Sequence, residues 1–130
     1  NGRSPSRTEY YTPGSVHSLK IEHDSPLTHG LGDHLDVLFN NSPLFDLEPG
    51  AETVGVTRLG WFDTDTPLRS GWAWGQERMQ GGTALIEAKL GDGELFLFTP
   101  RITFRSQSHA AFPLLFNGIF YGSANDEPIF

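Results

Sequence analysis

The chain has 130 residues, 37% hydrophobic and 19% charged, a balance that predicts one folded domain with one core rather than a disordered segment. The net charge of −7 argues against nucleic acid, because neutralising phosphates requires clustered Lys and Arg, and the nine basic residues here are scattered. The absence of Cys excludes disulfides and thiolate metal sites, and no apolar run approaches the roughly 18 residues that span a bilayer.

Turn-forming residues dominate the composition. Fifteen Gly and nine Pro favour short strands and many turns over a helix bundle. We therefore expect an α+β fold, a small β-rich domain with a hairpin and a C-terminal helix packed on the sheet. The opening NGRSPSRTEYYTPGS lacks an initiator Met and a signal peptide and is typical of the middle of a longer protein. The expected organisation is a linker or frayed N-terminus at 1–12, a single accessory domain at 13–124 and a tail at 125–130.

Alternating polarity predicts strands in the first half of the chain. The residues Val16, Ser18 and Lys20 alternate with His17, Leu19 and Ile21. This alternation predicts a strand with two distinct faces that ends near Glu22. Residues 35–39 predict a short second strand, and 44–47 a further one. Residues 53–62 are rich in β-branched and aromatic side chains and predict another strand, followed by a loop at 63–67.

The clearest local unit is a hairpin after the Trp-rich loop and a short helical turn at 76–80. Two apolar runs, 83–90 and 94–98, flank Gly91-Asp92-Gly93, and glycine adopts the positive φ that such turns require. Because Leu95 to Phe98 are all apolar, we expect that strand to be buried on both faces.

A helix is expected at the C-terminal end. Pro100 should bend the chain, 102–104 should continue the strand, and Ser108 should cap a helix over 109–121 that ends at Gly122. Five apolar residues recur at helical spacing, and this face should meet the hairpin in the core: Phe112, Leu115, Phe116, Ile119 and Phe120. The expected core joins Leu95, Leu97 and Phe98 to Leu115, Phe116 and Ile119.

Short blocks from residue 12 to 122 resemble the C-terminal region of bacterial proteins of the zinc carboxypeptidase (carboxypeptidase A-like) family. That region in turn is similar to the later half of a class I glutamine amidotransferase-like domain, which implies a truncated or diverged α/β unit. The blocks are Pro13-Gly14-Ser15, Ser25-Pro26-Leu27 with Gly30, Asn41-Ser42-Pro43-Leu44-Phe45, Ser70-Gly71-Trp72, Gly91-Asp92-Gly93 with Leu97-Phe98, Phe104-Arg105-Ser106-Gln107-Ser108-His109 and Leu115-Phe116-Asn117.

The catalytic signatures of these families do not occur in this chain. No His is followed by Glu three residues on, as the peptidase zinc site needs, and there is neither a Cys nor a Gly-x-Ser-x-Gly elbow. We therefore expect no catalytic residue, no metal site and no cofactor here. The resemblance implies zinc in a parent peptidase domain, contact with that domain, and a periplasmic or extracellular location. A homo-oligomer is a separate option that the sequence leaves open.

Two groups of residues are candidate binding sites. Trp72 and Trp74, with Trp61 and Phe62 nearby, could stack on sugar rings, anchor an interface with a neighbouring domain or simply belong to the core. Arg105, Gln107 and His109 alternate before the expected helix and could bind an anion there. The alternative is that Arg105 pairs with an acidic loop residue and Gln107 or Ser108 caps backbone groups.

Four histidines lie close together in the sequence, at positions 17, 23, 29 and 34, with aspartates between them. Two turns separate them, so surface or turn positions are the simpler interpretation than a metal cluster. Three functions therefore stand, in order: a non-catalytic accessory domain of an exported zinc carboxypeptidase-like protein, a carbohydrate- or cell-wall-binding module using the Trp residues, and a free-standing metalloenzyme.

Overall fold

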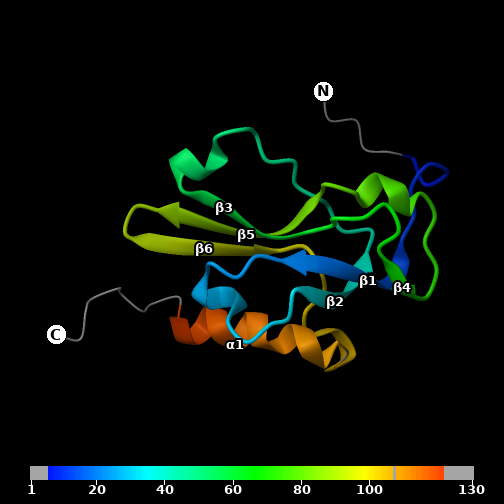
Figure 1. Ribbon diagram of the computed structural model, residues 1–130. Coiled ribbons are helices and arrows are strands. Elements are labelled where there is room, and N and C mark those ends of the chain that lie inside the picture. Colours follow the sequence, from blue (N-terminus) through cyan, green and yellow to red (C-terminus); the bar gives the residue numbers. More distant parts are fainter. Residues whose placement is uncertain (1–5, 107, 122–130) are drawn as a thin grey trace.

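The structure is a computed structural model that describes residues 6–106 and 108–121. A curled antiparallel sheet forms the body, and one α-helix lies along it (Figure 1). The strands are β1 (Pro13–Ile21), β2 (His34–Asn40), β3 (Val56–Trp61), β4 (Leu68–Ser70), β5 (Thr83–Leu90) and β6 (Gly93–Phe98), and the helix is α1 (Phe112–Tyr121). Short 3-10 turns are η1 (Pro26–Thr28), η2 (Ala51–Val54), η3 (Gln76–Met79), η4 (Phe104–Ser106) and η5 (His109–Ala111).

The sheet order is β2-β1-β3-β5-β6, and β4 also pairs with β1. β3 contacts the end of β1 at Lys20 and Ile21, whereas β4 contacts its beginning at Val16 and His17, so the two strands share one edge of β1. Every pair in the described strands is antiparallel, which is the expected α+β arrangement and not a parallel α/β unit.

The sidedness of β1 creates the core. His17, Leu19 and Ile21 are buried on one face, as the alternation predicted. β2 adds Leu35, Val37 and Phe39 to the same interior, because its register with β1 places alternate residues on the same side. Gly60 lets β3 cross closely, since a Cβ there would lie 2.7 Å from Leu85 Cδ1 and 2.9 Å from Leu19 Cδ2.

The hairpin prediction is confirmed, with one correction to its burial. β5 and β6 pair from Leu85–Phe98 to Leu90–Gly93, and Gly91 has a φ of 63° in the turn. β5 is central and buried over most of its length, but β6 is an edge strand on which Leu95 is 40% exposed. The expectation that 95–98 is buried on both faces is therefore wrong: α1 packs on β6 where Gly118 meets Phe96, but none of the four residues is fully buried.

The helix is present, but its expected buried face is wrong. Leu114 and Ala111 are buried, whereas Leu115, Phe116, Ile119 and Phe120 are exposed. Asn117 and Gly118 belong to the inner side: Asn117 Nδ2 donates to the carbonyls of Leu27 and His29, each at 2.9 Å, and a Cβ on Gly118 would touch Leu27 and Phe96. A polar side chain with two backbone acceptors and a glycine thus form the contact face.

The connections differ from the sequence expectations in four places. The segment 102–104 is not a strand, and the expected strand at 44–47 is reduced to one bridge between Phe45 and Thr83. The strand expected at 53–62 begins only at Val56, after η2. Ser108 makes no side-chain cap, and α1 follows η5 instead. Tyr10 packs on the core and Thr12 is buried, so the body begins before residue 13.

Within the described ranges, no helix has both the length and the apolarity needed to cross a membrane. The expected tail at 125–130 lies outside the described residues.

Candidate functional site

The segment 71–75, which we call the Trp loop, is held at both ends. It leaves β4 at Gly71, whose φ is 92°, and enters η3 at Gly75, whose φ is 71°. Tyr11 and Trp74 form an antiparallel bridge in which each backbone N–H donates to the other residue's carbonyl at 2.9 Å. A Cβ on Gly75 would collide with the backbone carbonyl of Glu9, so only glycine lets the loop approach the N-terminal segment this closely.

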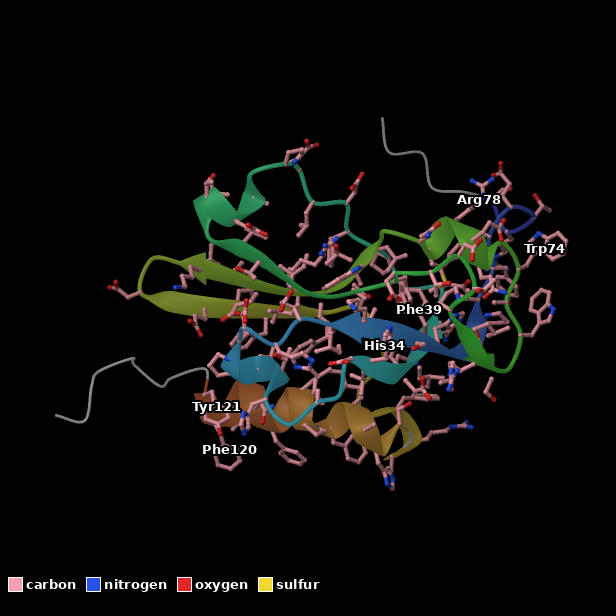
Figure 2. All side chains as sticks on the ribbon, in the orientation of Figure 1. His34, Phe39, Trp74, Arg78, Phe120 and Tyr121 are labelled. Carbon is pink, nitrogen blue, oxygen red and sulfur yellow. The ribbon has the colours of Figure 1, made fainter. Side chains whose placement is uncertain are left out.

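Both indoles of the Trp loop are exposed. Trp72 is 54% and Trp74 55% accessible, and Figure 2 shows Trp74 at the edge of the molecule. The Trp74 indole N–H donates to the Thr8 carbonyl at 2.8 Å, which fixes the ring without covering its faces. Tyr11 packs edge-on against Trp72 at a centroid distance of 6.1 Å. The third Trp differs, because the Trp61 ring is covered by the Arg58 guanidinium at 4.1 Å.

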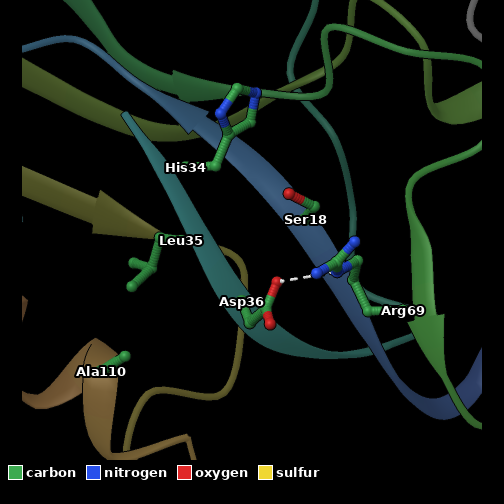
Figure 3. Close-up of a pocket in the computed structure, with 6 residues that line it drawn as sticks. All are labelled: Ser18, His34, Leu35, Asp36, Arg69 and Ala110. Carbon is green, nitrogen blue, oxygen red and sulfur yellow. Dashed lines mark ion pairs between the residues drawn. The ribbon is translucent and has the colours of Figure 1, made fainter. Parts of the chain in front are cut away.

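A second feature was not anticipated from the sequence. An open depression of about 560 Å³ lies on the outer side of β1 and β2 (Figure 3). Its polar groups come from three strands, and Arg69 Nε of β4 lies 3.6 Å from Asp36 Oδ1 of β2. The lining residues are Ser18, His34, Leu35, Asp36, Arg69 and Ala110. Asp36, the one polar residue in 35–39, was the only sequence signal for an outward face there, and strand order was needed to bring Arg69 to it.

The chemistry of this depression is limited by its pairings. The His34 Nε2 atom is 3.1 Å from Asp63 Oδ2, and the carboxylate of Asp36 forms an ion pair with Arg69. Ser18 has no hydrogen bond to His34 among the described contacts, so no nucleophile–base pair is assembled. The groups bridge strands across the sheet surface.

The histidines are dispersed over the structure. His23 pairs with Asp33 at 3.1 Å, His34 pairs with Asp63, and His29 lies against the Tyr121 ring. His17 is fully buried, and burial lowers its pKa to about 4. Across 6–106 and 108–121, no three His, Asp or Glu side chains come together as metal ligands would.

Two of the three residues expected to bind an anion lie in the described part of the chain. Arg105 is exposed with a φ of 52°, and its guanidinium lies 5.3 Å from the Phe104 ring centroid, beside that of Arg101. The His109 ring lies 5.2 Å from the Phe112 ring. Gln107, the third member, lies outside the described residues. No contact recorded in the described part joins this group to Trp72 or Trp74.

Comparisons with protein-family models, with curated proteins and with solved structures give no match to this chain.

Proposed function

We propose that this chain is a non-catalytic accessory domain of an exported zinc carboxypeptidase-like protein, and that the Trp loop docks on a neighbouring domain of that protein. One observation carries the proposal: two indoles, each more than half exposed, lie on a loop fixed at both ends. Exposed aromatic side chains on fixed backbone bind at little entropic cost, and Trp is enriched among the energetic anchors of interfaces.

The surroundings of the Trp loop support an interface. Arg69 lies before it and Glu77 and Arg78 after it, and all three are exposed. An apolar centre with a charged rim is the usual composition of a protein–protein contact. In this proposal zinc and peptide hydrolysis belong to the parent peptidase domain, and this chain contributes contact surface. Its place in the periplasm or outside the cell follows from the same resemblance.

The experiment is acrylamide quenching of Trp fluorescence, in this chain and in the longer parent protein. The fluorescence of Trp72 and Trp74 is isolated with the variant Trp61→Phe. We expect efficient quenching in the chain alone and at least several-fold weaker quenching in the parent. Equal quenching in both proteins would rule out docking through this loop. The matched control is the double variant Trp72→Phe/Trp74→Phe, in which the remaining Trp61 should be quenched alike in both proteins.

A second function is favoured by the same exposure together with Tyr11. Three aromatic rings on one short stretch of surface offer flat apolar faces to pyranose rings. If the module binds cell-wall carbohydrate, titration with cell-wall oligosaccharides should shift Trp emission saturably. The shift should be lost in Trp72→Ala/Trp74→Ala. A saturable shift of this kind favours the carbohydrate-binding module over interdomain docking.

A further inference from the structure

The outer face of α1 is an apolar surface left uncovered in the described residues. Phe116 is 52%, Ile119 64% and Phe120 74% exposed, and Leu115, Tyr121 and Phe104 are also more than a third exposed. Figure 2 shows Phe120 and Tyr121 pointing away from the body, at the opposite end of the molecule from Trp74. Contiguous apolar surface of this kind marks an interaction site. We call these six residues, five of α1 and Phe104 of η4 before it, the α1 face.

The charges flanking the α1 face differ between its two ends. The segment 100–111, which leads into the helix, carries Arg101 and Arg105 and no acidic residue. The segment 22–33 carries Glu22, Asp24 and Asp33 and neither Lys nor Arg. This acidic segment borders the C-terminal half of α1, because Asn117 bonds to the Leu27 and His29 carbonyls and the His29 ring meets Tyr121.

The α1 face has a basic end and an acidic end. Two copies of it are therefore complementary in charge when one copy is rotated by 180° so that opposite ends meet. In a two-fold pair, the basic end of each copy meets the acidic end of the other, and the two helix dipoles run antiparallel. In the opposite, parallel arrangement like charges would face each other in a chain that already carries −7. We propose that the α1 face binds a second copy of this chain, with the two α1 helices antiparallel about a two-fold axis near Phe116.

The size of the α1 face indicates how strongly two copies should bind each other. Six partly exposed, mostly aromatic side chains present on the order of 600 Å² per copy, near the lower limit for specific interfaces. The pair should therefore be reversible, with a Kd between about 10 µM and about 1 mM. It uses a surface distinct from the Trp loop and does not depend on the docking proposed for that loop.

Sedimentation of the chain over this concentration range tests the proposal. We expect the mean mass to rise from monomer to dimer and no further. Ile119→Glu should weaken association at least tenfold, whereas Val54→Glu, at an even more exposed apolar residue on η2, should leave it unchanged. Monomer at about 1 mM would overturn the proposal and leave the α1 face to a different partner. An equal effect of both variants would overturn it as well.

Charge reversal tests the end-for-end arrangement. Arg101→Glu and Arg78→Glu change the net charge equally, but Arg78 lies beside the Trp loop, far from α1 in Figure 2. We expect Arg101→Glu to weaken dimerisation several-fold more than Arg78→Glu. The same weakening by both would show a general charge effect and overturn the proposed orientation.

The geometry is tested by single cysteines, which the Cys-free chain allows. Phe116→Cys lies near the two-fold axis and should form an inter-copy disulfide on oxidation. Phe120→Cys lies four residues along the helix, so its two copies are about 12 Å apart and too distant for a disulfide. Equal crosslinking at both positions would overturn the antiparallel arrangement. Circular dichroism of each variant confirms that the fold is retained.

Discussion

His17 is a buried titratable residue in an apolar setting. Its Nε2 atom lies 2.8 Å from the Ser15 hydroxyl, while Nδ1 is buried without a partner in the described structure. The rings of Phe39 and Phe62 meet the imidazole edge-on at 6.1 and 6.2 Å. Within 6–106 and 108–121 no carboxylate forms a hydrogen bond or ion pair with the ring, so a proton on it would lack a counter-charge there. The neutral form is therefore the one compatible with the native core.

This environment predicts a loss of stability in mild acid. Burial lowers the pKa of His17 from 6.5 to about 4 in the folded protein. Between these values the unfolded chain binds the proton and the folded chain does not. Stability is therefore full above pH 6.5 and falls as the pH is lowered towards 4. The loss attributable to His17 should be about 2–3 kcal/mol at pH 4.5.

Urea unfolding at pH 7.5 and 4.5 measures this loss, and His17→Gln provides the comparison. The variant keeps a polar group but does not titrate. Between pH 7.5 and 4.5 its free energy of unfolding should therefore fall by about 2–3 kcal/mol less than that of the natural chain. Carboxylates titrate in both proteins and cancel in the difference. An identical pH dependence of the two proteins would mean that His17 is protonated in the native state without cost.

At the scale of the secondary-structure elements, α1 shows what the sequence could and could not predict. Helical periodicity located the helix, but FPLLFNGIFY is apolar on nearly every side, so periodicity alone did not determine which side is buried. The determining contacts are long-range: Asn117 needs the carbonyls of Leu27 and His29, and Gly118 fits against Leu27 and Phe96. The hairpin was predictable because its turn and both strands are local.

The same distinction applies to the candidate sites. The exposed Trp residues stand in one short loop, and Gly71 and Gly75 signalled its turns in the sequence. The depression beside Asp36 depends on Arg69 of β4 reaching across β1, which only the strand order shows. The regular strand expected before the helix is absent from the described residues, because the chain turns there through the left-handed residues Arg105, Ser106 and Ser108, and the anion site stays a prediction.

The corrected orientation of α1 predicts opposite results for two large-to-small substitutions. Leu114 is 1% exposed, so Leu114→Ala should destabilise the domain by about 2–5 kcal/mol through lost burial and a cavity. Phe120→Ala removes a larger side chain from the exposed face and should change stability by less than about 1 kcal/mol. Denaturant melts at low protein concentration measure both. Equal losses of stability in the two variants would mean that the outer face of α1 is buried in the core.

At the scale of the whole molecule, the chain has two exposed aromatic surfaces and no assembled catalytic group in the described residues. The pairs that come nearest to a metal site are His23–Asp33 and His34–Asp63. Each offers two possible metal ligands, and no third lies beside it in the described residues. A zinc hydrolase needs three protein ligands and an open position.

The corresponding prediction concerns the purified chain. With zinc added, it should not release the C-terminal residue from a free peptide faster than buffer does, and a C-terminally blocked peptide should behave in the same way. Mass spectrometry of the two peptides measures this. Turnover of the free peptide that disappears on adding a chelator would show a metal site assembled by this chain.

The bridge between Tyr11 and Trp74 also has a mechanical consequence. The segment before β1 is fastened to the Trp loop by paired backbone hydrogen bonds and by the Trp74 indole bond to Thr8. A pull transmitted along residues 6–10 therefore reaches the loop before it reaches the sheet. Tension there would break the backbone hydrogen bonds between Tyr11 and Trp74 and release the Trp loop, while the core strands stay paired. The Tyr11–Trp74 pairing would thus set how firmly the Trp loop is held on the body under load.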